Sequence, residues 1–252
     1  MRILLIRHGE PDYATDTLTA RGRREAELLR DRMRAYHIRD FYVSPLGRAR
    51  ETAEYTLRDQ GRTAEVLPWL AEFRARFPDP ETGRERILWD QRPRVWTAHP
   101  ELMDPDAWAD SPFYAAGNAR DIWDETRTGV DQLMARYGFH RDGPVWRCRE
   151  NTRDTLALFC HFGISMAVLA CLMDLSPVPL WHRCLTLTSS LTEVVTEERL
   201  PGEVSFRVTR LGDTSHLEAA SVSRSTAGLY PECYTGVDST DPFTNRAPDW
   251  EL

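Results

Sequence analysis

The sequence predicts an α/β fold, a three-layer αβα sandwich with a mainly parallel central sheet. Three observations predict it. Short apolar runs alternate along the chain with longer runs of helix-forming residues. Two of the apolar runs end directly before a histidine, at His8 and at His161. The chain has 252 residues, of which 41% are hydrophobic, and this is enough for one large domain with a full core.

The first part of the chain alternates regularly. Residues 2–7 (RILLIR) are a short apolar run bounded by His8-Gly9, which is typical of a buried strand. Residues 19–36 place Ala26, Leu29 and Met33 on one face of a predicted amphipathic helix. We expect these two elements to be followed by a strand at 40–43, a helix at 46–57 and a strand at 64–67.

Residues 73–117 break this alternation and are rich in Pro, Asp, Arg and Trp, which predicts an inserted cap packed over the domain. The pattern resumes with a helix, a buried strand, an apolar helix and two strands that close the sheet, expected at 118–137, 156–160, 164–173, 185–195 and 203–211. We therefore predict one domain over residues 1–217, followed by a Ser-, Thr- and Pro-rich carboxyl-terminal extension over 218–252.

Composition limits the partners. The net charge of -7 disfavours nucleic acids and membrane surfaces, and any anion site must be a local pocket. The five cysteines are scattered and form no CxxC pair, so neither a disulfide framework nor a metal site is expected. We expect no leader peptide, because the sequence enters an apolar strand at once, and no membrane span, because no apolar run is long enough to cross a bilayer. We expect a cytoplasmic protein; its oligomeric state is left open.

Four residues at strand ends or helix starts form the candidate site: Arg7, His8, Arg48 and His161. In an open α/β sheet, ligands bind beyond the carboxyl ends of the strands, where helix amino termini attract anions. A neutral histidine attacks phosphorus when its other ring nitrogen donates to an acceptor, while two guanidinium groups and a protonated second histidine balance the phosphate charge. This chemistry requires neither metal nor cofactor.

Six ordered segments carry a family resemblance: LIRHGE (5–10), LTARG (18–22), SPLGRARETA (44–53), LAE (70–72), FCHFG (159–163) and GDTSHL (212–217). They resemble the motifs of the histidine phosphatase superfamily, in its phosphoglycerate mutase-like branch. One RHG triplet is weak evidence, whereas several motifs in the right order at strand–helix junctions are strong. The last segment is similar to the closing strand of that family.

The resemblance implies that His8 is a phosphoryl-accepting nucleophile, that Arg7, Arg48 and His161 bind the phosphate, and that Glu72 is the proton donor and later the base. The substrate would be a small-molecule phosphomonoester. Glu10 or an acid of the insertion is the alternative donor. A donor directly after the second histidine is disfavoured because Phe162 stands there.

Two alternative functions stay open. The first is a phosphoglycerate mutase-type phosphomutase, which is less favoured because Ala14 stands where the mutases have Asn. The second is a phospho-ligand binding module without catalysis. Other histidines are expected to be structural: His216 at the sheet edge, and His182, which with Cys184 supplies too few ligands for a metal.

Overall fold

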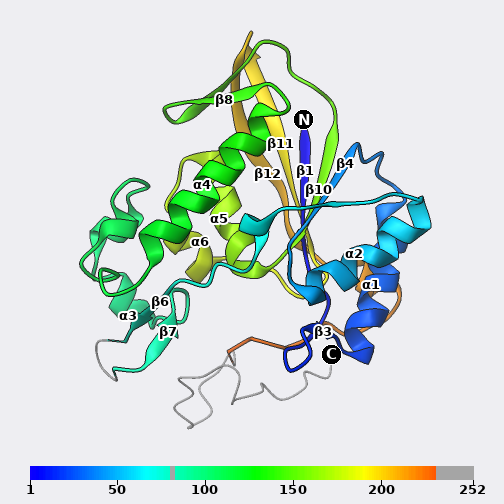
Figure 1. Cartoon of the computed structure of the whole chain (residues 1–252), viewed down its shortest axis with the longest axis horizontal. Coiled ribbons are helices and arrows are strands. Elements are labelled where there is room, and N and C mark those ends of the chain that lie inside the picture. The colour runs from blue at the N-terminus through cyan, green and yellow to red at the C-terminus, as the bar shows by residue number, and fades with distance from the viewer. Residues whose placement is uncertain (80–82, 231–252) are drawn as a thin grey trace.

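An eight-stranded sheet runs through the computed structural model, which describes residues 1–79 and 83–230 (Figure 1). Across the sheet the strands are β5 (Glu65–Val66), β4 (Asp40–Val43), β10 (Thr155–Cys160), β1 (Arg2–Arg7), β11 (Leu191–Leu200), β12 (Glu203–Asp213), β9 (Val145–Cys148) and β8 (Phe139–Asp142). The first four are parallel, and the others extend the sheet with antiparallel pairings. The predicted α/β fold is confirmed.

The register of the parallel strands brings the two histidines together. Arg7 is paired with Cys160 across β1 and β10, so the next residues, His8 and His161, leave the sheet side by side. On the other side of β10, Phe159 is paired with Val43, which places Ser44 next to the same edge. Because parallel strands end at the same side of a sheet, three segments distant in sequence meet there.

Helices cover both faces of the sheet (Figure 1). The helices α1 (Ala20–Met33) and α2 (Gly47–Gln60) lie on one face, and α4 (Ala119–Ala135), α5 (Phe162–Met173) and α6 (Pro177–Arg183) lie on the other. Alternate residues of β1 serve the two faces: Leu4 and Ile6 pack with α1 and α2, whereas Leu5 packs with α5. Each such buried side chain contributes about 2 kcal/mol of transfer free energy.

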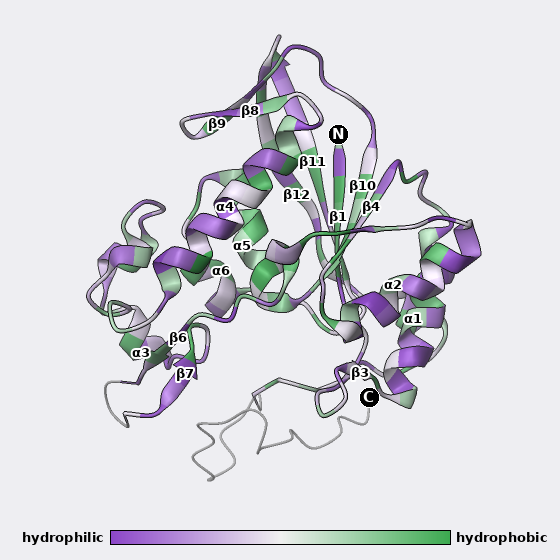
Figure 2. Ribbon diagram, viewed as in Figure 1, coloured by the Kyte–Doolittle hydropathy of each residue, from purple (hydrophilic) through white to green (hydrophobic). Residues whose placement is uncertain are grey.

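Hydropathy follows this layering (Figure 2). The helix α5 is apolar on nearly all sides, and ten of its twelve residues are buried between the sheet and the outer helices. The helices α1, α2 and α4 are hydrophilic on their outer faces. The apolar residues on all sides of α5 are therefore explained by the position of this helix inside the protein.

The predicted insertion has structure of its own. It contains the antiparallel strands β6 (Arg76–Pro78) and β7 (Glu85–Ile87), the helix α3 (Pro93–Trp96), and 3₁₀ helices at Pro100–Met103 and Trp108–Asp110. Its Trp108 is fully buried and meets Trp123 of α4 edge to face at 5.3 Å and Trp181 of α6 at 5.5 Å. Aromatic packing thus attaches the insertion to the helices on one face of the sheet.

Several elements differ from the predicted ones. Residues 185–190, expected as the start of a strand, form a loop, and β11 begins only at Leu191. The segment resembling a closing strand (212–217) ends its strand at Asp213, and the short helix α7 (Ser215–Ala219) follows. The β8–β9 hairpin, α6 and the small β2 (Pro11–Asp12) and β3 (Thr17–Leu18) pair were not predicted.

Cys148, Cys160, Cys171 and Cys184 are free thiols. Cys233 and residues 231–252 of the expected extension lie outside the described residues. Within 1–79 and 83–230, no helix has the length and apolarity that a membrane span requires, and no group of three or more His, Cys, Asp or Glu side chains could hold a metal ion.

Candidate active site

The structure brings the predicted site residues together at the carboxyl ends of β1 and β10. The rings of His8 and His161 lie 5.0 Å apart. Arg7 ends β1, and Arg48 enters from the first turn of α2. All four side chains are at least 90% buried. The amino termini of α2 and α5 begin here, and their free N–H groups favour an anion at the same place.

Hydrogen bonding defines which nitrogen of His8 can react. Its Nδ1 lies 2.7 Å from the carbonyl oxygen of Gly9, which can only accept, so Nδ1 carries the proton. The lone pair is then on Nε2, which the Nε–H of Arg48 approaches at 3.3 Å. Burial, together with the charges of Arg7 and Arg48, holds the pKa of His8 well below its ordinary value. The imidazole is therefore neutral and nucleophilic.

Arg48 is oriented by Asp16, a residue without a recognised role in the sequence. The Nη1 of Arg48 donates to Oδ1 of Asp16 at 2.5 Å, and the backbone N–H of Gly47 donates to Oδ2 at 2.7 Å. Partial burial opposes ionisation of Asp16, but the hydrogen bonds from Gly47 and Arg48 outweigh it and lower the pKa of the carboxyl. The carboxylate thus fixes both the helix start and the guanidinium.

Arg7 is fixed by the loop that replaces the expected strand. Its Nη1 donates to the carbonyl of Thr186 at 2.5 Å, and its guanidinium lies 5.8 Å above the ring of Phe162. Its buried Nε has no hydrogen-bond partner among the described residues. A buried cation with an unused donor is suited to bind an anionic ligand.

His161 presents a second unused donor. Its Nε2 lies 2.7 Å from Oγ of Ser44, and that hydroxyl already accepts the N–H of Leu46 at 3.2 Å. We assign the hydroxyl proton to Nε2, which leaves the proton of the ring on Nδ1, a buried atom without a partner in the described structure. Burial, with the charges around it, keeps the pKa of His161 well below its ordinary value. The neutral ring thus offers one N–H to an anionic ligand, and the negative charge of a bound phosphate would favour the protonated form.

Glu72 approaches the site from the loop after the 3₁₀ helix Pro68–Leu70. Its Oε1 accepts the N–H of Phe73 at 2.9 Å and that of Ile164, in the first turn of α5, at 3.0 Å. Burial raises the pKa of Glu72, although these hydrogen bonds and the nearby arginines oppose the shift. A carboxyl with a raised pKa is suited to donate a proton.

Gly163 is required by close packing at this point. A Cβ atom there would lie 2.4 Å from the ring of Trp89 and 2.8 Å from Oε1 of Glu72. Trp89 of the insertion also meets Phe162 edge to face at 5.7 Å. The insertion therefore supplies one wall beside the candidate proton donor.

A buried carboxyl supports the segment that follows the nucleophile. Glu25 of α1 accepts the N–H of Glu10 at 2.9 Å and the hydroxyl of Thr188 at 3.1 Å. Burial raises its pKa to about 7. Glu10, the alternative proton donor, is engaged by the hydroxyls of Thr19 and Ser225 at 2.8 and 2.6 Å. This pairing makes Glu10 the weaker candidate.

Three contributors were missed in the sequence: Asp16, Glu25 and the carbonyl of Thr186. Of these three, only Glu25 could have been found from the sequence, because a carboxyl on the apolar face of an amphipathic helix requires a hydrogen-bond partner. Asp16 has a positive φ of 52° in a short loop, and the role of Thr186 belongs to its backbone. Residue type alone therefore predicts neither the role of Asp16 nor that of Thr186.

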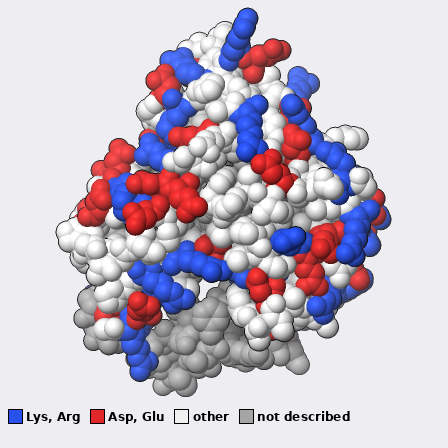
Figure 3. All heavy atoms as spheres, viewed as in Figure 1, with Lys and Arg blue, Asp and Glu red and all other residues white. Residues whose placement is uncertain are grey.

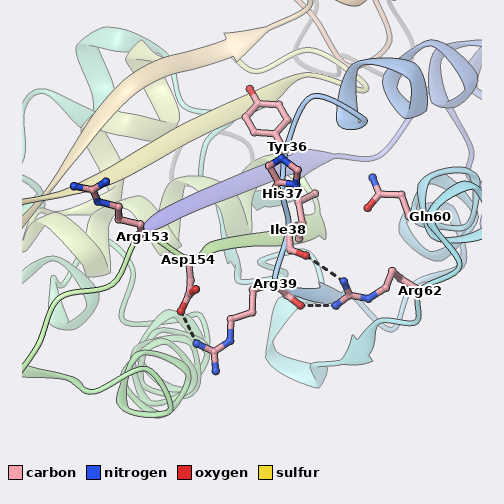
Figure 4. Close-up of a pocket in the computed structure, with 8 residues that line it drawn as sticks. All are labelled: Tyr36, His37, Ile38, Arg39, Gln60, Arg62, Arg153 and Asp154. Carbon is pink, nitrogen blue, oxygen red and sulfur yellow. Dashed lines mark hydrogen bonds and ion pairs between the residues drawn. The ribbon is translucent and has the colours of Figure 1, made fainter.

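The other histidines have separate surroundings. His182 stacks on Trp96 at 4.7 Å, and Nε2 of His216 lies 3.1 Å from Oγ of Ser189. A shallow pocket lies where the parallel strands begin, at the opposite end of the sheet (Figure 4). Arg39 is paired there with the carboxylate of Asp154, and Arg62 donates to backbone carbonyls, including that of Ile38 at 3.2 Å. This pocket contains none of the predicted site residues.

The family model of the histidine phosphatase superfamily, branch 1, matches residues 3–209, a span that includes every predicted site residue. The chain belongs to this superfamily. The predicted family and the predicted enzyme class, a phosphatase, are thereby confirmed.

Known relatives of this histidine phosphatase are also phosphatases. An adenosylcobalamin/alpha-ribazole phosphatase of Salmonella typhi is 25% identical over 191 residues, which is 72% of this chain and 84% of the relative. A probable phosphatase of Schizosaccharomyces pombe is 23% identical over 243 residues, 89% of this chain and 99% of the relative.

Solved structures show the same fold. A phosphoserine phosphatase mutant of Entamoeba histolytica in complex with phosphoserine superposes with a TM-score of 0.57 at 19% identity, covering 86% of this histidine phosphatase and 98% of that chain. A mycobacterial glucosyl-3-phosphoglycerate phosphatase complexed with VO3 gives a TM-score of 0.55 at 20% identity, covering 84% and 98%.

Proposed function

We propose that this chain hydrolyses small-molecule phosphomonoesters through a phosphohistidine on His8, without a metal ion or cofactor. The observation that carries the proposal is the hydrogen bond of 2.7 Å between Nδ1 of His8 and the carbonyl of Gly9, since it leaves the lone pair on Nε2, the nitrogen that Arg48 approaches at 3.3 Å. Arg7, Arg48 and His161 bind the phosphoryl oxygens, the last through its unused Nδ1–H.

The reaction has two steps. In the first, Nε2 of His8 attacks phosphorus, the bond to the ester oxygen breaks, and Glu72 gives its proton to the departing alcohol. In the second, water attacks the phosphohistidine while the Glu72 carboxylate takes a proton from it. The P–N bond breaks, inorganic phosphate leaves, and His8 and Glu72 return to their starting states.

The test is hydrolysis of p-nitrophenyl phosphate in the presence of EDTA at pH 5 to 7, with wild type, His8→Ala and Glu72→Ala. We expect turnover by wild type, none by His8→Ala and a strong loss in Glu72→Ala. Arg58→Gln, an exposed change on the outer face of α2, is the control and should match wild type.

A trapping experiment tests the intermediate directly. Acid-labile, base-stable phosphate should appear on wild type and Glu72→Ala after brief incubation with substrate, and should be absent from His8→Ala. Equal turnover by wild type and His8→Ala would reject the nucleophile. Phosphoryl transfer to glycerate instead of water would favour a mutase, and binding of inorganic phosphate without any turnover would favour a binding module.

A further inference from the structure

Aromatic rings contact both phosphate arginines. The guanidinium of Arg7 lies 5.8 Å from the ring centroid of Phe162, and that of Arg48 lies 5.4 Å from the ring centroid of Tyr13. Both arginines are buried, whereas Tyr13 is 54% exposed and Phe162 is half-buried. Guanidinium groups favour the faces of aromatic rings. The two rings therefore lie beside the buried arginines with part of their surface open to solvent.

The ring of Phe162 continues into the insertion. It meets Trp89 edge to face at 5.7 Å, and Trp89 is also only half-buried. Trp89 packs on Trp181 of α6 at 5.8 Å, and Nε1 of Trp181 donates to the carbonyl of Gly163 at 2.9 Å. These contacts fix Trp89 beside Phe162. Phe162 and Trp89 together form a continuous apolar surface, the aromatic wall.

The aromatic wall lies next to the candidate proton donor. A Cβ atom on Gly163 would meet both the ring of Trp89 and Oε1 of Glu72, so the ring and the carboxyl are neighbours. Phe162 directly precedes Gly163 at the start of α5. Figure 3 shows a hollow between the insertion and the helices α1 and α2, toward which β1 and β10 run (Figure 1), and basic side chains follow its edge. The wall and the carboxyl of Glu72 thus line the same side of the site.

The reaction places the alcohol part of the substrate on this side. Glu72 must reach the ester oxygen in order to protonate it, so the alcohol part extends from the phosphate toward Glu72. The neighbouring side chains Phe162 and Trp89 offer ring surfaces and no charge. Transfer of apolar surface from water to such a wall is favourable, whereas hydroxyl groups placed against it would lose their hydrogen bonds to water.

We infer that Phe162 is a specificity-determining residue, whose ring binds the alcohol part of the phosphomonoester together with Trp89. The inference rests on the proposed function and adds its substrate class: phosphomonoesters of apolar alcohols, in particular those that carry a planar ring. The phosphate itself remains bound by Arg7, Arg48 and His161, which fix its orientation.

The experiment compares kcat/KM for three monoesters of primary alcohols, which differ little in chemical reactivity. One, 2-phenylethyl phosphate, carries an aromatic ring; butyl phosphate carries an apolar chain, and glycerol 3-phosphate carries two hydroxyl groups. We expect wild type to prefer 2-phenylethyl phosphate to glycerol 3-phosphate by about tenfold or more. In Phe162→Ala this preference should fall about tenfold, chiefly through KM.

Phe162→Leu separates the planar ring from its apolar area. This variant should retain the preference for butyl phosphate over glycerol 3-phosphate and lose the preference for 2-phenylethyl phosphate over butyl phosphate. Inorganic phosphate has no alcohol part, so its Ki should stay within about twofold of wild type in both variants. Phe113→Ala is the matched control and should keep the wild-type preferences, because its half-buried ring packs on His99 and Tyr114 within the insertion.

Equal substrate preferences in wild type and Phe162→Ala would overturn the inference, as would a wild-type preference for glycerol 3-phosphate. A defect of Phe162→Ala that is the same for all three esters and for inorganic phosphate indicates a displaced Arg7 and also overturns it. Turnover of p-nitrophenyl phosphate without turnover of the three esters overturns the inference and leaves the phosphatase intact. Absence of turnover on all four substrates rejects the proposed function as well.

Discussion

Oε1 of Glu72 accepts a hydrogen bond of 3.0 Å from the backbone N–H of Ile164, in the first turn of the helix that begins after His161. This bond ties the loop before the insertion to the phosphate site. No hydrogen bond between Oε2 of Glu72 and a described residue competes with proton exchange at that oxygen.

The pH dependence of turnover should follow from Glu72 and His8. Burial raises the pKa of Glu72 and lowers that of His8, so the reactive pair, a protonated acid and a neutral imidazole, coexists at mildly acidic pH. We expect kcat/KM to fall as pH rises through the pKa of Glu72. Glu72→Gln should lower kcat by about 10²–10⁴ and remove this alkaline limb. If kcat/KM of Glu72→Gln fell with rising pH as that of wild type does, the titrating group would be a residue other than Glu72.

Asp16→Asn should weaken phosphate binding without removing the nucleophile. The variant keeps a side chain suited to positive φ but loses the charge that orients Arg48. Because the side chain of Asp16 is 42% exposed, we expect a moderate effect, about fivefold in KM for an aryl phosphate and in Ki for inorganic phosphate. Asp59→Asn, which removes a surface pair with Arg34 behind the site, is the control. Equal KM values for both variants would contradict the role of Asp16.

Gly163→Ala should be costly because its methyl group would meet Trp89 and Glu72 at impossible distances. We expect a loss of about 1–3 kcal/mol in the free energy of unfolding, or a displaced Glu72 with reduced kcat. Urea unfolding and initial rates measure the two outcomes. Trp89→Ala should relieve the first clash, so the double variant should lose less stability than the sum of the single variants. Strict additivity would mean that the two residues do not touch.

Glu25 should make stability depend on pH. Its pKa is about 7 in the folded protein and about 4.5 when unfolded, so the folded state binds the proton more tightly. The stabilising contribution is full below about pH 4.5 and is lost as pH rises toward 7, by up to about 3 kcal/mol.

The measurement is urea unfolding between pH 4.5 and pH 8. Glu25→Gln, which keeps the size and can still bond to Thr188 and Glu10, should show a smaller loss than wild type over this range. Glu27→Gln, a neighbouring exposed change on α1, should behave as wild type. A wild-type loss that persists undiminished in Glu25→Gln would point to a different carboxyl.

Much of the site could be predicted from the sequence because its two histidines directly follow the carboxyl ends of two apolar strands. The apolar runs before His8 and His161 fix both strand ends, and parallel pairing then brings the histidines together. Glu72 could be reached only through the family resemblance, since the loop that carries it has no periodicity. The role of Asp16 could not be predicted, because its contact with Arg48 depends on the positive φ of this one residue.

The loop at 185–190 shows why one element was predicted wrongly. Its alternation of leucine and threonine has the pattern of a strand, and short patterns carry no information on distant partners. In the structure, Nη1 of Arg7 donates to the carbonyl oxygen of Thr186, and the backbone carbonyl oxygen of His8 accepts the N–H of Ser189 at 2.9 Å. The tertiary contacts of this loop with Arg7 and His8 thus outweigh the preference of its residues for a strand.

The contact between Trp89 and Gly163 means that the insertion is not an interchangeable module. A chimera that takes residues 73–117 from a relative would bring a different side chain to the position of Trp89, while Gly163 and Glu72 would stay with the recipient. A smaller residue leaves a void beside the carboxyl group, and a larger or displaced one pushes on it. An exchange of insertions between relatives would therefore have to include both the residue at position 89 and the residue at position 163. Substitutions in the insertion are in this way linked to substitutions at the start of the helix that follows the second histidine.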